Sequence, residues 1–174
     1  MLTINSTKDY FKSFFANQLT ALTVLGFLAF IVPIVFAHAS FQNQLIIGIA
    51  VNFLLASSAL NLGLKRTLPI ILLPSLGALA SGIVFGPFTI FLVYLVPFIW
   101  VGNAVYAWII SSFAQKTGYL ALISGASLAK ALAIFVPTLG LFYFGLVPEV
   151  LLIPMGILQF ATALVGGTLA GITK

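Results

Sequence analysis

Few side chains in this sequence are able to do chemistry. Its 174 residues include one histidine (His38), two carboxylates (Asp9 and Glu149) and no cysteine. Acid–base catalysis and metal sites need several such groups converging on one place, and without cysteine no thiolate site or disulfide is possible. We therefore expect no catalytic residues, no metal site and no cofactor, and we interpret the chain as a binding or structural protein, not an enzyme.

Lys130 is a cation in the middle of an apolar stretch. It lies roughly 11 residues into a helix predicted over 119–144, which is about 17 Å at about 1.5 Å per residue. That depth is near the middle of a hydrocarbon core about 30 Å thick, where a charge costs at least about 2.5 kcal/mol. Neither carboxylate is placed to neutralise it, so its partner is water in a cavity, an amide or carbonyl, another subunit, or an anionic ligand. The alternative is a lysine whose stem reaches out to the headgroups.

Three amides fall at comparable depth in three other apolar stretches. Each is explained by itself as an interhelical hydrogen bond. Together with a cation and two tryptophans near Asn103 in the sequence (Trp100 and Trp108) they indicate a polar pocket with apolar walls, the usual composition of a small-molecule site. His38, at the outer end of the first apolar stretch, either touches an entering ligand or has no function there. The candidate substrate-binding residues are Lys130, Asn103, Gln159, Asn52, Trp100 and His38.

The composition predicts an all-α integral membrane protein. Hydrophobic residues make up 62% of the chain and charged residues 5%, whereas a soluble domain has roughly a quarter charged residues. We expect a single transmembrane domain over 1–174 with a short interfacial helix within the first 18 residues. Apolar stretches of about 20 residues suit spanning helices. Six are predicted, at about 19–37, 45–62, 67–85, 89–110, 119–144 and 151–172.

The basic residues predict the orientation. Every lysine or arginine outside a predicted span falls on one side of this six-helix arrangement, and by the positive-inside rule that side is cytoplasmic. Both termini are then expected in the cytoplasm. Because these residues occur singly or in pairs, they do not indicate nucleic-acid binding. They are Lys8, Lys12, Lys65, Arg66, Lys116 and Lys174.

Three segments carry a resemblance to a known family. They are PFIWVGNA at 97–104, SLAKAL at 127–132 and MGILQFATALVGG at 155–167. With the whole-chain pattern of six predicted helices, the sequence resembles the S components of energy-coupling factor (ECF) transporters, which are membrane proteins of nearly this length with both ends in the cytoplasm.

The resemblance implies a substrate-capture subunit in a bacterial or archaeal plasma membrane. It would bind a vitamin-like molecule from outside and deliver it inward when docked on a transmembrane T component driven by two ATPases. The chain has no GxxxxGK[ST] phosphate loop, so the partners would hydrolyse ATP. Family pockets draw on helices four to six, which matches Asn103, Lys130 and Gln159. The family's Ala-x-x-x-Ala-x-x-x-Ala docking stripe in helix one here reads Ala21, Leu25, Ala29, so a docking surface of altered shape is expected.

Other functions remain open from the sequence. A structural or assembly protein would use the polar groups only to hold helices together. A stand-alone transporter or channel is disfavoured because proton coupling usually uses carboxylates within the membrane. An enzyme would need a serine, Ser124 or Ser127, with Lys130 as its base.

Overall fold

The computed structural model describes residues 7–37 and 41–174, and every regular element in this part of the chain is helical. A short helix precedes longer ones, and three 3-10 turns (η1 to η3) flank them. The α-helices are α1 (Thr7–Ala16), α2 (Gln18–Val35), α3 (Phe41–Leu62), α4 (Leu64–Ser81), α5 (Leu92–Phe113), α6 (Tyr119–Tyr143), α7 (Leu152–Met155) and α8 (Ile157–Ala170). The 3-10 turns are η1 (Gly86–Phe91), η2 (Glu149–Leu151) and η3 (Gly171–Thr173).

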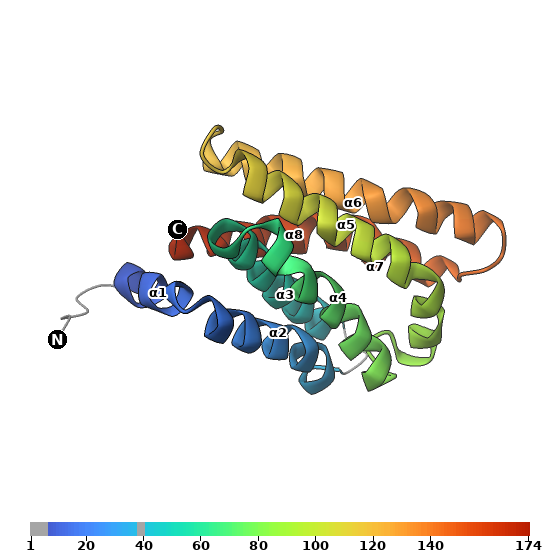
Figure 1. The fold of residues 1–174 in the computed structure, drawn as a ribbon. Coiled ribbons are helices and arrows are strands. Elements are labelled where there is room, and N and C mark those ends of the chain that lie inside the picture. Colours follow the sequence, from blue (N-terminus) through green and yellow to red (C-terminus); the bar gives the residue numbers. More distant parts are fainter. Residues whose placement is uncertain (1–6, 38–40) are drawn as a thin grey trace.

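The long helices lie side by side and alternate in direction (Figure 1). α3 is central and contacts α2, α4, α5 and α8, while α6 contacts α5 and α8. The closest neighbours are the pairs α3–α8, α5–α6 and α2–α4. A helix satisfies its own backbone groups, which is why apolar helices suit a solvent without hydrogen-bonding partners.

Five stretches of the described chain are long and apolar enough to cross a membrane: Gln18–Val35, Gln42–Leu62, Gly86–Phe113, Tyr119–Tyr143 and Glu149–Thr173. Large apolar side chains are exposed along them, among them Phe27, Leu120 and Ile157. Such a surface suits lipid and not water. The chain therefore has the helices and the exterior of a multi-pass membrane protein, and the expectation of long apolar helices is confirmed for these five stretches.

The sixth predicted span, at 67–85, corresponds to α4, which is not among these five. α4 begins earlier than predicted, at Leu64, so its first turn includes Lys65 and Arg66, which lower its mean hydropathy. It also ends earlier, at Ser81, because Gly82 adopts the left-handed conformation (φ 71°) that commonly ends helices. Its direction in the bundle is nevertheless that of a helix joining the two ends (Figure 1).

The last predicted span, at 151–172, is interrupted. It consists of η2, α7, α8 and η3, with a break at Gly156. Pro154 lacks the N–H that would continue the helix ladder toward residue 150. The break lies between Met155 of α7 and Gln159 of α8, the second of which is a candidate binding residue.

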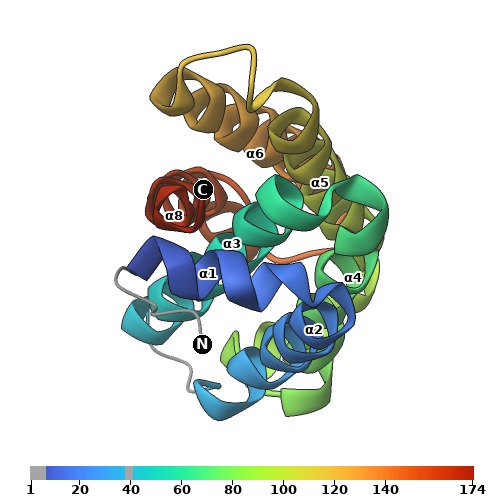
Figure 2. The same ribbon diagram turned by 60° about the vertical axis from the view of Figure 1, so that its left-hand side comes forward.

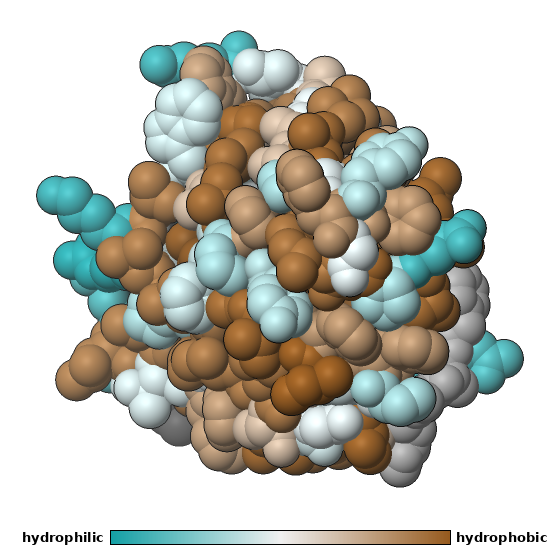
Figure 3. All heavy atoms as spheres, turned by 90° about the vertical axis from the view of Figure 1, so that its right-hand side faces the viewer, coloured by the Kyte–Doolittle hydropathy of each residue, from teal (hydrophilic) through white to brown (hydrophobic). Residues whose placement is uncertain are grey.

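The two ends of the bundle differ in charge. α1, the C-terminus and the α3–α4 and α5–α6 connections lie at one end, and the α4–η1 and α6–η2 connections at the other (Figure 1). The basic residues of the described chain other than Lys130 belong to elements at the first end. Figure 2 shows α1 running across this end. Figure 3 views the opposite end, where apolar side chains dominate and strongly hydrophilic ones lie mainly along the outline.

α1 has the amphipathic character expected of an interfacial helix. Phe15 is buried, Phe11 and Phe14 are half-buried, and Lys12 is exposed. Tyr10, by contrast, is 62% exposed and lies on the side of α1 turned away from the bundle. The aromatic residues after Tyr10 therefore attach α1 to the end of the bundle.

Candidate functional site

Lys130 lies inside the bundle. It belongs to the face of α6 that also carries Ser127 and Ile134, both buried, whereas Leu128 and Leu132 on the opposite face are about half exposed. Only 2% of Lys130 is exposed, so its stem does not reach out to the headgroups. Its Nζ donates a hydrogen bond to Asn52 Oδ1 at 2.5 Å. The sequence left open whether this side chain points into the bundle or reaches out to the headgroups, and in the structure it points into the bundle.

An aromatic ring faces the same ammonium. Nζ lies 5.4 Å from the centroid of the Tyr106 ring, within the range of a cation–π interaction. Tyr106 is fully buried, and its hydroxyl donates to the Ala163 carbonyl at 2.8 Å. The carboxylates Asp9 and Glu149 belong to α1 and η2, at opposite ends of the bundle. The ammonium is thus held by an amide oxygen and a ring.

Asn52 is fixed by a hydrogen-bond network between α3 and α8. Its Nδ2 donates to the Gly48 carbonyl at 2.8 Å and to Thr162 Oγ1 at 3.2 Å. Because both of these bonds use the NH₂ group, the amide oxygen must point the other way, toward Lys130. The network determines which atom of the amide meets the cation.

Asn103 presents a different polar atom. Its Nδ2 donates to the Ile71 carbonyl at 3.0 Å, which joins α5 to α4. Its Oδ1 is buried and has no hydrogen-bond partner among the described residues. Turning the amide over would place its oxygen against the Ile71 carbonyl, so the observed orientation is the favourable one. A buried acceptor without a partner costs about 1–3 kcal/mol, so this atom is a natural contact for a ligand donor.

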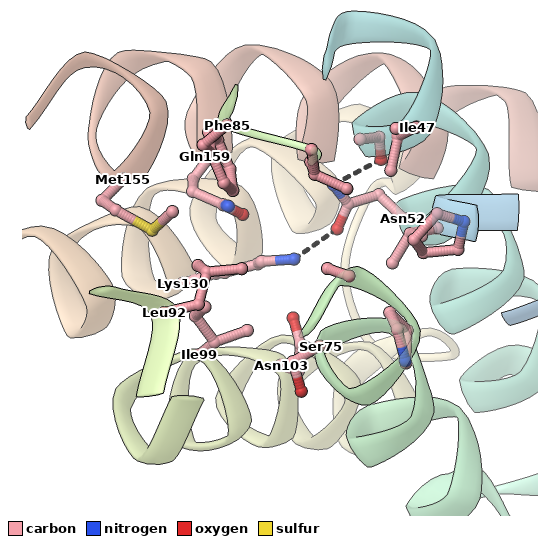
Figure 4. Close-up of a pocket in the computed structure, with 16 residues that line it drawn as sticks. Ile47, Asn52, Ser75, Phe85, Leu92, Ile99, Asn103, Lys130, Met155 and Gln159 are labelled. Atoms are coloured by element: carbon pink, nitrogen blue, oxygen red, sulfur yellow. Dashed lines mark hydrogen bonds between the residues drawn. The ribbon is translucent and has the colours of Figure 1, made fainter. Parts of the chain in front are cut away.

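These polar residues line one cavity, which we call the Lys130 cavity (Figure 4). Its volume is about 100 Å³. Lys130 reaches across it from α6 toward Asn52, with Gln159 of α8 on one side and Asn103 of α5 on the other. Gln159 is half-buried, and no hydrogen bond from its amide occurs within the described residues. The four polar residues that the sequence singled out, Lys130, Asn52, Asn103 and Gln159, come from four different helices and all line this cavity.

Apolar side chains and prolines form most of the cavity wall. Ser75 contributes a hydroxyl, which is already occupied: it donates to the Leu72 carbonyl at 2.9 Å and accepts from Trp100 Nε1 at 2.7 Å. The apolar lining residues are Pro33, Ile47, Val51, Pro74, Ala78, Val84, Phe85, Leu92, Ile99 and Met155. Hydrogen bonds hold the side chains of Asn52, Asn103 and Ser75 in place, so the cavity combines fixed polar atoms with apolar walls, the usual composition of a small-molecule site.

Two of the predicted binding residues, Trp100 and His38, are not among the described residues that line the cavity. Trp100 is half-buried and does not line the cavity; its Nε1 donates to Ser75 Oγ, which does line it, and to the Leu72 carbonyl. It faces α4 because its position on α5 is turned away from α6. His38 lies outside the described residues.

The predicted docking stripe on α2 faces inward. Ala21 and Ala29 are fully buried and Leu25 is 5% exposed, on the side of α2 that packs against α4. In this conformation a partner cannot reach the three side chains. The exposed face of α2 is instead formed by larger residues, including Leu19, Phe27 and Val35.

Sequence reasoning missed several residues of the site. Tyr106, Thr162 and Phe85 take part in the network or the lining, but an aromatic or a threonine in an apolar helix gives little signal by itself. Tyr106 follows Asn103 by three residues and so shares its helix face. This spacing is the feature of the sequence from which the position of Tyr106 beside the site could have been predicted.

Comparison of the chain with protein-family models, with curated proteins and with solved structures gave no match. The interpretation of the site therefore depends on its own geometry. That geometry combines a buried cation, an unpartnered amide oxygen and a second amide around one cavity.

Proposed function

We propose that this chain is the membrane-embedded substrate-binding subunit of an ECF-type uptake transporter. In this proposal it crosses a bacterial or archaeal plasma membrane six times, with α4 as the sixth span and both termini in the cytoplasm. It captures a vitamin-like small molecule from the outer side. A transmembrane T component and two ATPase subunits would supply the energy.

The observation that carries the proposal is Lys130, a buried ammonium that donates a hydrogen bond to an amide oxygen and lines a cavity with apolar walls. Placing a charge there is costly, and an amide oxygen only partly compensates it. A ligand carrying a negative charge or a carbonyl would complete the coordination of the ammonium. The basic end of the bundle supports the orientation, since it would face the cytoplasm.

A structural or assembly protein is the second candidate, favoured by two observations. Asn52 already provides Lys130 with a partner, and the cavity of about 100 Å³ is smaller than the roughly 300 Å³ of the smallest typical ligand pockets. In that case the polar residues only join helices. The binding experiment below separates the two candidates.

The test is the identification of what the protein binds. The full chain is purified in lipid nanodiscs after expression in its native type of cell, and the small molecules it carries are extracted and identified by mass spectrometry. We expect a solute that is enriched with the wild type and depleted at least tenfold in Lys130→Met, with Lys116→Met as the control, because Lys116 is an exposed lysine outside the cavity.

Copurification in mild detergent tests the partners. A T component and two ATPases should be recovered with the chain. Recovery of no solute and no partner would favour the structural candidate. Uptake by the purified chain alone in liposomes would instead indicate a stand-alone transporter.

A further inference from the structure

Two more cavities continue from the Lys130 cavity toward the end of the bundle that carries η1 and η2. The second, of about 80 Å³, shares Ile47, Phe85 and Gln159 with the Lys130 cavity. The third, of about 220 Å³, shares Gln44 and Phe85 with the second. It extends to Phe88, Val150 and Ile153, which are exposed. Phe85 lines all three cavities.

The volumes restrict the shape of a ligand. The Lys130 cavity, at about 100 Å³, offers space for a head group and not for a whole ligand. Ligand pockets typically measure about 300 Å³ or more, so a ligand of ordinary size would extend from the Lys130 cavity into the next two. The occupant is therefore elongated, with a small head at Lys130 and a body directed toward Phe88 and Val150.

The fixed polar atoms restrict the chemistry of that head. The ammonium of Lys130 has three N–H donors, of which one is used by Asn52 Oδ1. The remaining donors call for an acceptor, and a negative charge is favoured beside a cation with no carboxylate at hand. Asn103 Oδ1 is a buried acceptor without a partner and calls for a donor. Both residues line the same cavity, so one head must offer both groups.

From these constraints we infer the substrate class: an elongated molecule whose head combines a carboxylate with an adjacent N–H or O–H donor, the carboxylate against Lys130 and the donor against Asn103. This inference rests on the proposed function and specifies the substrate of the same site. The body of the ligand contacts mostly apolar walls, and the polar side chains along the path are those of Gln159, Thr162 and Gln44.

Three probes that differ at single groups test the inference. N-hexanoylglycine has the carboxylate and the neighbouring N–H. N-hexanoylsarcosine keeps the carboxylate and replaces the N–H by an N-methyl group, and N-hexanoylglycine methyl ester keeps the N–H and removes the charge. Binding to the full chain in nanodiscs is measured by titration calorimetry, with empty nanodiscs subtracted. We expect N-hexanoylglycine to bind about tenfold more tightly than either of the other two, since each loses one buried polar contact.

Variants assign each preference to its residue. Lys130→Met should abolish the preference for the acid over the methyl ester, and Asn103→Leu the preference for the N–H over the N-methyl compound. Lys116→Met and Asn61→Leu are the matched controls, because neither residue lines the cavities, and both should keep both preferences. Each comparison is a ratio of affinities within one preparation, so a partly folded sample does not alter it. Lys130→Gln and Asn103→Ser repeat the comparison if an apolar replacement fails to fold.

Three results would overturn the inference: no binding of N-hexanoylglycine to the wild type, equal binding of the three probes, or preferences that survive the two variants. Identification of the natural solute distinguishes this failure from failure of the proposed function. A bound solute that lacks the carboxylate or the donor removes only the inference about the substrate class. The absence of any bound solute and of any copurifying partner removes the proposed function as well.

Discussion

The contact between Lys130 and Asn52 determines how a charge is tolerated inside this bundle. The ammonium has an amide oxygen and the Tyr106 ring around it in place of a carboxylate. Removing one partner of a buried charged group is more damaging than removing both, because the remaining charge is left uncompensated. The stability of the protein should therefore depend more on Asn52 than on Lys130.

We predict that Asn52→Leu lowers the free energy of unfolding by about 3 kcal/mol. Adding Lys130→Met to this variant should restore most of the loss, because the double variant has neither the buried charge nor the need for an acceptor. Thermal unfolding in detergent, followed by circular dichroism, gives the four values of the cycle. If the two substitutions simply add, the ammonium does not depend on Asn52.

Asn103 is predicted to behave differently. Asn103→Leu removes the hydrogen bond to the Ile71 carbonyl but also removes the unpartnered Oδ1. A typical hydrogen bond contributes about 0.5–1.5 kcal/mol and an unpartnered buried acceptor costs a similar amount, so the two effects should nearly cancel. The same unfolding measurement should show a change below about 1 kcal/mol, and a loss above about 3 kcal/mol would mean that Oδ1 has a partner.

The sequence predicted the polar part of the site because such residues are conspicuous in apolar helices. Lys130 and the three amides, Asn52, Asn103 and Gln159, meet at one cavity as expected from their depths. Depth follows from residue number at 1.5 Å per residue, but rotation about the helix axis depends on packing. That is why Trp100, three residues before Asn103 on the same helix, donates to Ser75 and does not line the cavity.

Close contacts between helices depend on glycine and alanine, the residues with the smallest side chains. Gly77 of α4 faces the backbone of α2 so closely that a methyl group there would overlap the Phe30 carbonyl oxygen. Small residues at helix interfaces allow such approach in membranes. The buried alanines of α2, Ala21 and Ala29, pack in the same interface. The short distance between α2 and α4 therefore depends on the small size of these residues.

We predict that Gly77→Ala destabilises the protein by about 1–3 kcal/mol, the usual cost of adding atoms to a packed contact. Gly125→Ala is the control, because a methyl group at this helical position meets no atom within 4 Å. There alanine should be neutral or slightly stabilising. Equal unfolding temperatures for the two variants would show that α2 moves away from α4 at little cost.

Helix existence was predictable and helix interruptions were not. Five predicted spans appear as long apolar helices, because a run of about 20 apolar residues is a strong signal. The stop at Gly82, the 3-10 segment η1 and the break at Gly156 were not predicted at those residues. Glycine and proline are frequent in membrane helices, and only local packing decides which of them interrupts one.

The two ends of the molecule differ in charge and in the position of the cavities. Its basic residues outside the core lie at the end with α1 and the C-terminus, and the cavities continue from Lys130 toward the other end. A substrate entering from the outer side would thus meet the cavities before the basic end. This arrangement depends on α4 crossing the membrane, which its hydropathy alone does not establish.

Cysteine labelling decides the path of α4, and the chain suits it because it contains no cysteine. Single variants place a cysteine at Lys65, at the start of α4, and at Phe88, just after it. Both positions are exposed, and so are the control positions Lys116 and Val150 at the two ends of the bundle. In intact cells, a membrane-impermeant maleimide should label Phe88→Cys and Val150→Cys, and it should label Lys65→Cys and Lys116→Cys only after the membrane is permeabilised.

The pattern of labelling separates the possible topologies. If α4 lies within one leaflet, Lys65→Cys and Phe88→Cys will be labelled from the same side, and the chain will have five spans with its ends on opposite sides. If the whole arrangement is inverted, Lys65→Cys and Lys116→Cys will be labelled in intact cells. Inversion would place the cavities toward the cytoplasm, and capture of a solute from outside would then lose its route, because the entrance at Phe88 and Val150 would face the wrong compartment.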